Sequence, residues 1–352
     1  MTERLRDDPD GLSVLCAAAA DWLTDRRGTH VPALIVEKDF WVTEVLRAST
    51  APQLFGRTGK DNCDLTVRPV FKGGTSLSKA HGIIERFSED ADVYLDISPA
   101  HADDVARNYP IGNNRVDTIM RATATMIGMA IGVEPEPMGV ARTGTKRGYA
   151  YQYPNAKVSA ASGFKEGVLL ELVRMGTPTP NASHTIQSLL ADYASATGRV
   201  PTEDFDELAP FRINVLCPER TLVDKLSILH GVATEVLAGE DPRAAGQLAY
   251  HSRHYYDVHR LLTNQAVMQS LQAQPGLIAG YAEDAYAESI AARRPATVRP
   301  VGGFAVSPAF RNEAVLAMAR ADYQIEMNRL SLGPTPDFNE AITTVAAAAS
   351  HL

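Results

Sequence analysis

The spacing of hydrophobic and polar positions changes along the chain and divides it into three regions. Residues 1–50 are alanine-rich, with apolar positions at helical spacing. Residues 51–180 contain strand-like alternation that is interrupted by helical spacing. A connection rich in Pro, Thr, Ser and Asn, near residues 176–184, leads into residues 181–352, where the spacing is mainly helical. The pattern predicts an α/β (α+β) protein with N-terminal helices, a sheet-containing core and a mostly helical C-terminal lobe.

The middle region contains the most regular of the predicted elements. Alternation from residue 90 onward predicts a strand whose buried face is formed by Ala91, Val93, Leu95 and Ile97. A helix is predicted from Ser76, with a buried stripe formed by Leu77, Ala80, Ile84 and Phe87. In that helix Lys79 and Arg86 would share another face. Further strands are predicted at "LTVRPVFKGG", "ARTGTKRGYAYQYPN", "EGVLLELVRMG" and "FRINVLC", and a further helix at 114–132.

A turn of small residues and a pair of carboxylates lie between two of these strands. The turn consists of Gly73, Gly74, Thr75 and Ser76. Its glycines let the backbone approach phosphate oxygens, the N–H groups that open the next helix attract anions, and the hydroxyls would add contacts. Asp90 and Asp92 project from one face of a strand and would repel each other unless a cation lay between them. The combination predicts Mg²⁺ and phosphoryl chemistry.

Each half of this motif also has a purely structural interpretation. The turn could be a tight strand-to-helix connection in which Thr75 or Ser76 is the N-cap. The two acids could be solvated residues of an exposed edge strand. That interpretation accounts for the alternation of the strand, but it leaves the preceding glycine turn unexplained.

The composition is that of an ordinary globular protein. The 352 residues are 45% hydrophobic and 22% charged, and no apolar run approaches the roughly eighteen residues of a membrane span. The N-terminus lacks a signal peptide's hydrophobic stretch, and three scattered cysteines favour neither disulfides nor zinc, so we expect a cytoplasmic protein. The net charge of −8 argues against broad nucleic-acid binding, although local groups such as Arg142, Lys146 and Arg147 could form a basic patch.

The run "FKGGTSLSKAHGIIERFSEDADVYLDI" resembles the AbiEii/AbiGii-type (MenT-like) nucleotidyltransferase toxin family, a branch of the DNA polymerase beta-like nucleotidyltransferases. Three more blocks are similar to blocks of that family in the same order: "EKDFWVTEVL" from Glu37, "PERTLVDKLSILH" from Pro218 and "SRHYYDVHRLL" from Ser252. Together they span most of the chain. The resemblance implies a polymerase-beta-like nucleotidyltransferase core with a mixed sheet at 51–180. It also implies that Asp90 and Asp92 are catalytic metal ligands and that the Gly73–Ser76 turn binds the nucleotide.

The resemblance implies further site residues outside this run. A neighbouring strand usually supplies a third metal-binding carboxylate, and Glu171 is our candidate because it is the only charge within "VLLELV". Asp96 competes with it but lies roughly 13 Å beyond Asp92 along an ideal strand. Lys225 would neutralise the triphosphate, although its place beside an apolar helical stripe also suits a surface lysine. Asp257 would orient Lys225 or position the attacking group.

Other groups in these blocks have structural alternatives. Asp257 could instead pair with Arg253 or Arg260 on its own helix. Tyr255 and Tyr256 could stack on a base or pack in the interior. We expect the block from Glu37 to Asp39 to hold the N-terminal helices against the core.

The resemblance finally implies the toxin of a toxin–antitoxin or phage-defence system, with an antitoxin encoded in the same operon. We expect a metal-dependent enzyme that uses Mg²⁺ or Mn²⁺ to transfer a nucleotide from an NTP to an RNA hydroxyl. The expected acceptor is the 3′ end of tRNA, because relatives modify that end and so block translation. Two alternatives stay open: transfer to a protein or small-molecule hydroxyl, which needs no basic rim, and a nucleotide-binding regulator without catalysis.

Overall fold

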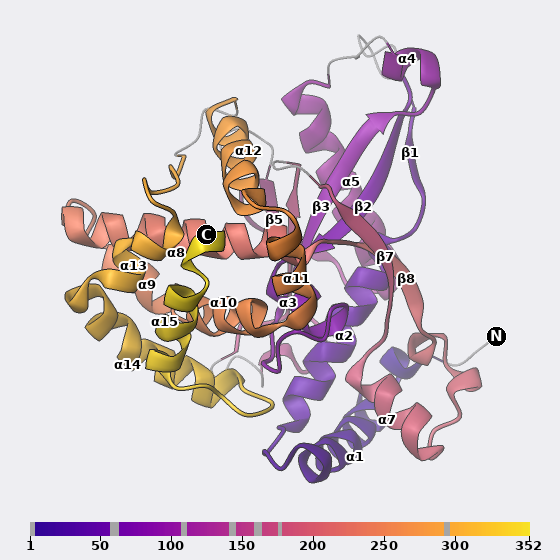
Figure 1. The fold of residues 1–352 in the computed structure, drawn as a ribbon. Coiled ribbons are helices and arrows are strands. Elements are labelled where there is room, and N and C mark those ends of the chain that lie inside the picture. The colour runs from indigo at the N-terminus through magenta and orange to yellow at the C-terminus, as the bar shows by residue number, and fades with distance from the viewer. Residues whose placement is uncertain are drawn as a thin grey trace. The chain divides into compact units, whose positions relative to one another are not determined.

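A computed structural model describes residues 4–56, 63–106, 111–140, 146–157, 164–174, 178–291 and 296–352. The chain forms two compact units, and most of their elements are labelled in Figure 1. The first unit comprises Met1–Ala80 and Ser88–Leu216, and the second comprises His81–Phe87 and Cys217–Leu352. The first unit thus continues past the boundary that we expected near residue 180.

A mixed sheet forms the centre of the first unit. In the described residues its eight strands follow the order β4-β5-β6-β3-β2-β8-β7, with β1 paired to β2 beside this path. The β3–β6 and β2–β8 pairs are parallel, and the other pairs are antiparallel. The strands are β1 (Gln53–Phe55), β2 (Leu65–Lys72), β3 (Asp90–Pro99), β4 (Pro135–Val140), β5 (Lys146–Tyr151), β6 (Val168–Val173), β7 (Asn181–Ile186) and β8 (Phe211–Leu216).

Helices cover the apolar face of this sheet. Helix α2 (Ala33–Ser49) contacts β3, β6, α5 (Asn113–Ile131), α1 (Pro9–Arg27) and α7 (Leu189–Thr197). The short helices α3 (Gly73–Lys79) and α4 (Ala102–Ala106) contact β3. The predicted alternation of β3 is confirmed, because Ala91, Val93, Leu95 and Ile97 are buried. The acids of β3 therefore lie on the opposite face, away from the helical layer.

The helix predicted through Phe87 is wrong beyond Lys79. Helix α3 ends at Lys79, and Gly82 has a φ of 61°, a left-handed conformation that a continuing helix does not adopt. Phe87 is buried as predicted, but it lies in an extended segment of the second unit, where its N–H donates to Leu330 O. The predicted shared face of Lys79 and Arg86 therefore does not exist.

The sequence analysis did not predict strands β4 and β7, which both lie at edges of the sheet. Strand β4 contains Pro135 and Pro137, and β7 has the polar sequence "NASHTI" with mostly exposed residues. Edge strands accept proline and polar residues on both faces, so they lack the alternation by which central strands are recognised. Strand β7 falls in the segment that we interpreted as a connection.

The second unit is helical, as expected. Its helices are α8 (Pro218–Ala238), α9 (Ala244–His251), α10 (Arg253–Thr263), α11 (Gln265–Ala273), α12 (Leu277–Ala291), α13 (Pro308–Arg311), α14 (Glu313–Leu330) and α15 (Phe338–Ala347). The segment His81–Phe87 belongs to this unit and forms an isolated bridge from Arg86 to Ser331. Among the described helices of the whole chain, none is both long and apolar enough to span a membrane.

Candidate functional site

The glycine turn lies against the strand that carries the two aspartates. Strand β2 pairs antiparallel with β3 so that Lys72 faces Asp92, and the chain then turns at Gly73. Gly73 has a φ of 77°, and a Cβ at this position would overlap the Asp92 carboxylate. A side chain is therefore excluded both by the backbone conformation and by the neighbouring acid. The structure therefore places the turn in direct contact with Asp92.

The two hydroxyls of the turn are used within the protein. Thr75 Oγ1 donates to Asp90 O at 2.5 Å, and Ser76 Oγ donates to Gly73 O at 2.8 Å. Both side chains are buried. Thr75 thus fixes the start of β3 to α3, whereas Gly74 remains partly exposed. In this arrangement the backbone of the turn, rather than its hydroxyl groups, is the part available to a phosphate.

Three carboxylates lie on one face of neighbouring strands. The parallel pairing of β3 and β6 puts Glu171 directly beside Asp92, and Asp90 is two residues away on the same face. Burial raises the pKa of Asp92 from 3.8 to about 6, and the carboxylates of Glu171 and Asp90 add to the shift. Repulsion of this kind is relieved when a cation binds among the acids. The structure therefore brings the predicted trio together.

Two lysines partly balance this charge. Lys146 Nζ lies 2.6 Å from Glu171 Oε2, and Lys165 Nζ lies 2.7 Å from Asp90 Oδ2. The sequence analysis placed Lys146 only in a basic patch and missed Lys165, although Lys165 comes just before the strand that carries Glu171. Arg142 of that patch lies outside the described residues. Glu171 and Asp90 are thus paired with ammonium groups, which a divalent cation would have to displace.

One oxygen of the trio remains without a partner. Asp90 Oδ1 is buried and has no hydrogen-bond partner among the described residues. No three His, Cys, Asp or Glu side chains in that part of the chain are already arranged around a common metal position. Nevertheless, the donor set consists of carboxylate oxygens, which Mg²⁺ and Mn²⁺ prefer, and one of those oxygens is buried and unpaired. The residues therefore fit a divalent cation, provided that Lys146 or Lys165 gives way.

A buried ion pair holds Lys165 in place. Lys38, on α2, is fully buried, and its Nζ lies 2.7 Å from Glu89 Oε2 and also donates to Lys165 O. The same Glu89 oxygen accepts from Lys165 N at 2.7 Å. Burial alone would raise the pKa of Glu89, but the Lys38 ammonium and the Lys165 N–H keep it below its ordinary value. A second ion pair joins Asp39 Oδ1 to Lys79 Nζ at 2.6 Å, so the block from Glu37 to Asp39 holds α2 against the core, as expected.

The second unit contains a different charged cluster around Asp257. This carboxylate contacts Lys225 Nζ at 2.7 Å and accepts two 2.7 Å hydrogen bonds from Arg86. His254 Nδ1 lies 3.3 Å from both Asp257 Oδ2 and Lys225 Nζ, and His251 Nδ1 lies 3.2 Å from His254 Nε2. Burial alone would raise the pKa of Asp257, but Arg86 and Lys225 hold it well below its usual range. Asp257 therefore pairs directly with Lys225, and its role in orienting that lysine for a phosphate stays a prediction.

The alternatives weighed for this region are also decided by its contacts. Asp257 pairs with Arg86, from a distant part of the sequence, whereas Arg260 pairs with Glu85 and the Arg253 guanidinium lies over the Tyr250 ring. Lys225 is buried, so it is not a surface lysine. Tyr255 packs edge-on against Phe310 and Phe338, and Tyr256 Oη accepts from Glu85 N, so the packing interpretation holds for both.

Taken alone, the first unit presents a class of site suited to phosphoryl chemistry: a glycine turn of positive φ beside carboxylates on neighbouring strands. The sequence matches, over residues 61–344, the family described as "Nucleotidyl transferase AbiEii toxin, Type IV TA system". Since this match covers well over half of the chain, the protein belongs to the AbiEii family of nucleotidyltransferase toxins. The predicted family is thereby confirmed, and the match covers three of the four sequence blocks, because the block from Glu37 lies before residue 61. Family membership implies an NTP substrate and an antitoxin partner.

Among solved structures, the chain is similar to the nucleotidyltransferase toxin MenT4 from Mycobacterium tuberculosis H37Rv. The two are 16% identical, the alignment covers 94% of this chain and 98% of that chain, and the TM-score is 0.33. At this TM-score the likeness does not establish a shared fold. No curated protein matches the chain.

Proposed function

We propose that this toxin transfers a nucleotide from an NTP to a hydroxyl of RNA, with the 3′ acceptor end of tRNA as the substrate. An oxygen of the acceptor attacks the α-phosphorus in line, the bond to the bridging oxygen of the β-phosphate breaks, and pyrophosphate leaves. The hydroxyl proton passes to solvent. Blocking the acceptor end would prevent aminoacylation and so stop translation. The choice of tRNA rests on the family resemblance.

The observation that supports this proposal best is the contact between Gly73 and Asp92. It joins the two halves of the motif, which the sequence alone leaves open to separate structural explanations. The register that places Glu171 beside Asp92 adds the third carboxylate. A solvated edge strand would not need a glycine whose missing Cβ leaves space for an acid. It would also not place a third carboxylate beside two others, because like charges in neighbouring positions destabilise a sheet.

Asp90, Asp92 and Glu171 would hold Mg²⁺ or Mn²⁺. Such ions, when bound, neutralise the triphosphate and lower the pKa of an attacking hydroxyl. The Gly73–Ser76 turn would position the triphosphate through its backbone N–H groups, with Thr75 and Ser76 keeping the turn in shape. Lys146 and Lys165 would release their carboxylates when the cation binds and could then contact phosphate oxygens.

Lys225 remains our candidate for a second phosphate-binding group, on the strength of the family block in which it lies. Its ammonium is buried, and burial lowers its pKa while Asp257 opposes that shift. Asp257 would keep Lys225 charged and oriented. Because Arg86 also contacts Asp257, this carboxylate is paired even when Lys225 moves toward an anion.

The test incubates the purified protein with total tRNA, Mg²⁺ and each α-³²P-labelled NTP in turn. Asp92→Ala is the loss-of-site variant, and Asp25→Ala, an exposed acid of α1, is the matched control. Label should enter RNA from one preferred NTP with the wild type and with Asp25→Ala, and Asp92→Ala should lose it by about a thousandfold. Mn²⁺ binding, followed by electron paramagnetic resonance, gives a readout that does not depend on transfer.

Other outcomes would select the alternatives. Label that enters protein or a small molecule, and not RNA, would move the acceptor to that class. Bound NTP without any transfer, unchanged in Asp92→Ala, would instead support a non-catalytic regulator.

A further inference from the structure

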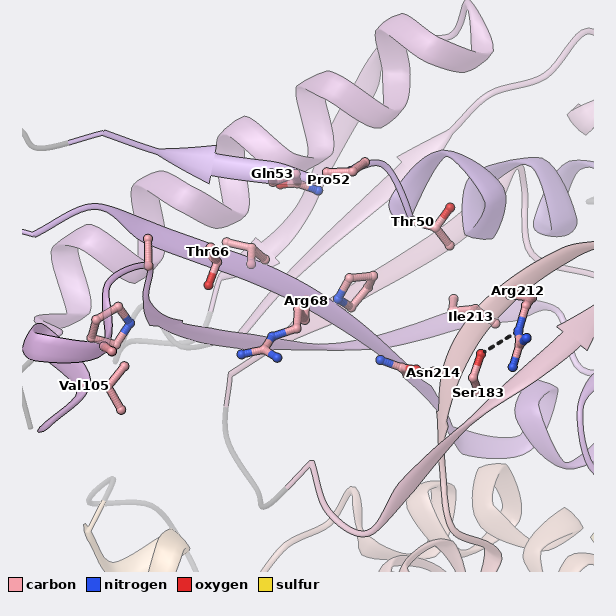
Figure 2. Close-up of a pocket in the computed structure, with 15 residues that line it drawn as sticks. Thr50, Pro52, Gln53, Thr66, Arg68, Val105, Ser183, Arg212, Ile213 and Asn214 are labelled. Carbon is pink, nitrogen blue, oxygen red and sulfur yellow. Dashed lines mark hydrogen bonds between the residues drawn. The ribbon is translucent and has the colours of Figure 1, made fainter.

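A cavity of about 730 Å³ lies in the first unit, on a part of the sheet that the proposed chemistry does not use (Figure 2). Residues of β2, β7 and β8 line it, together with residues at the ends of β1 and β3 and from α4. Its volume lies within the range of roughly 300–1,000 Å³ that is usual for ligand sites. Its floor and walls include Pro69, Ile213 and Val67, so it offers apolar surface as well as polar groups.

The charge of this cavity differs from that of the whole chain. Its described lining contains Arg68 and Arg212 and no Asp or Glu, although the protein has a net charge of −8. Arg212 Nε donates to Ser183 Oγ at 3.1 Å, the dashed line in Figure 2, and no acid in the described residues pairs with it. Arg68 lies 3.8 Å from Asp96, but the two side chains are 63% and 39% exposed, and a pair of this kind is weak. Both guanidinium groups can therefore accept an anionic ligand.

The cavity continues the face of the sheet that carries the catalytic acids. In the β2–β3 pair, Arg68 faces Asp96 and Lys72 faces Asp92, and opposed residues of an antiparallel pair share a face. Arg68 is four residues from Lys72, which corresponds to about 13 Å along a strand. Asn214, paired with Val70 across the parallel β2–β8 ladder, carries the same face into β8. A chain molecule that lies along this face could reach both places.

We propose that the cavity around Arg68 and Arg212 binds a backbone phosphate of the acceptor RNA, on the strand that leads away from the reacting hydroxyl. This inference rests on the proposed function and adds a second, non-catalytic contact to it. Guanidinium forks match the paired oxygens of a phosphodiester, and Ser183 and Asn214 offer further donors. The apolar wall suits a sugar or the edge of a base. The cavity therefore supplies local positive charge that attracts a polyanion, although the net charge of the protein is negative.

The test measures the binding of a fluorescein-labelled single-stranded RNA of about 12 nucleotides by anisotropy, across a series of salt concentrations. The variant is Arg68→Gln/Arg212→Gln. The matched control is Arg26→Gln/Arg199→Gln, which removes the same charge from exposed residues of the same unit that do not line the cavity. We expect the cavity variant to bind about tenfold more weakly. The slope of log Kd against log salt should fall by about 0.7, for one lost phosphate contact. The control pair should keep the wild-type slope.

A charge-preserving variant, Arg68→Lys/Arg212→Lys, separates electrostatics from geometry. It should recover most of the salt slope but only part of the affinity, because lysine lacks the bidentate fork. Equal losses in the cavity variant and in the control pair would overturn the proposal, as would unchanged RNA binding in the cavity variant. The proposal would also be overturned if inorganic phosphate competed as well as RNA does, because the cavity would then bind a small anion. It would likewise be overturned if the cavity variant lost binding of polyglutamate but not of RNA, because the cavity would then bind an acidic peptide.

The transfer assay keeps this inference separate from the proposed function. The cavity variant should raise KM for RNA with little change in kcat, since Arg68 and Arg212 do not touch the reacting atoms. Asp92→Ala should lose transfer and keep RNA binding. If the wild type transfers no label to RNA, the proposed function fails, whereas the anisotropy measurements still decide whether the cavity binds RNA.

Discussion

The two charged clusters of this protein use the same residue types in opposite ways. In the first unit, Asp90, Asp92 and Glu171 lie together, one carboxylate oxygen is unpaired and the pKa of Asp92 is raised, although Lys72, Lys146 and Lys165 lie near them. In the second unit, Asp257 is enclosed by Lys225 and Arg86, every one of these side chains is buried, and its pKa is lowered. One cluster is therefore electrostatically strained, and the other is satisfied.

The difference shows how a binding site can be told from a structural ion pair by its balance of charge. Repulsion among like charges destabilises the free protein, and for this reason we propose a cation among Asp90, Asp92 and Glu171. Around Asp257, in contrast, the folded state itself supplies the partners. The positive charge around Asp257 also supports the proposed contact between Lys225 and a phosphate.

The strongest test of the comparison is the stability of two isosteric variants. Asp257→Asn should destabilise the protein by about 3–5 kcal/mol, because Lys225 and Arg86 would remain buried without their counter-ion. Asp92→Asn, in contrast, should raise the free energy of unfolding of the first unit, because it removes a buried negative charge beside two other carboxylates. Both tryptophans, Trp22 and Trp41, lie in the first unit, so their fluorescence reports that unit during urea unfolding. Hydrogen exchange of peptides from α8 and α10 reports the second.

The pH dependence gives the sign of the Asp92 effect. The pKa of Asp92 is raised in the fold to about 6, so the folded state binds more protons than the unfolded state between pH 3.8 and 6. Stability from this group is present below that window and is lost as the pH rises through it. The stability advantage of Asp92→Asn over the wild type should therefore be larger at pH 8 than at pH 5.

Asp284→Asn is the control for Asp257→Asn. Asp284 is an exposed partner of Arg220, so its replacement should change the free energy of unfolding by less than about 1 kcal/mol.

The next largest effect concerns the choice of the third carboxylate. Glu171→Gln should lower nucleotide transfer by about a hundredfold, because it removes a negative charge beside Asp92 while keeping the shape of the side chain. Asp96→Asn, on the same strand face but about 13 Å away, should change transfer less than threefold. Initial rates with saturating NTP distinguish the two. Equal losses would mean that the register of β3 and β6 does not define the metal site.

A smaller effect is expected at the edge of the second cluster. Burial, followed by the nearby charges of Arg253 and Lys225, lowers the pKa of His251 from 6.5 to about 4. The unfolded state then binds more protons between pH 6.5 and 4, so stability falls as the pH falls through this window. Between pH 7 and pH 5, the free energy of unfolding of His251→Gln should fall by about 2 kcal/mol less than that of the wild type. His254 and Tyr250, which pack against this ring, remain in both proteins.

Urea unfolding at the two pH values measures this difference. His101→Gln, at an exposed position of the first unit, shows what the loss of a surface imidazole does. An unchanged pH dependence in His251→Gln would show that the buried pair of histidines does not contribute to acid sensitivity.

Sequence reasoning was most successful where one physical rule acted alone. The alternation of β3 needs only a buried and an exposed face, so it predicted the places of Asp90 and Asp92. Glu171 could be chosen because a charge inside an apolar strand is costly without a purpose. The pairing of Glu171 with Asp92 required the sheet order, which no local pattern contains.

What could not be predicted depends on contacts between distant segments. Arg86 was assigned to a helix because its neighbours have helical spacing, yet its segment crosses into the second unit and pairs with Asp257. Lys165 was missed because its role depends on Glu89 and Lys38, which reach it from other parts of the chain. Buried ion pairs of this kind form only after the elements have packed, and the sequence marks them no differently from surface charges.

The last test separates the cost of the left-handed backbone from the cost of contact with Asp92 at the glycine turn. Gly73 and Gly132 both have a positive φ, 77° and 75°, but only Gly73 would bring a Cβ into an acid, since nothing lies within 4 Å at Gly132. Gly132→Ala should therefore cost about 1 kcal/mol from the left-handed backbone alone. Gly73→Ala should cost about 1–2 kcal/mol more, and it should lower transfer about a hundredfold by displacing Asp92. Tryptophan fluorescence measures both stabilities in the first unit. If the two variants are equally stable and equally active, the close approach of turn and carboxylate is not needed for function, and the strained cluster would have to be explained without the turn.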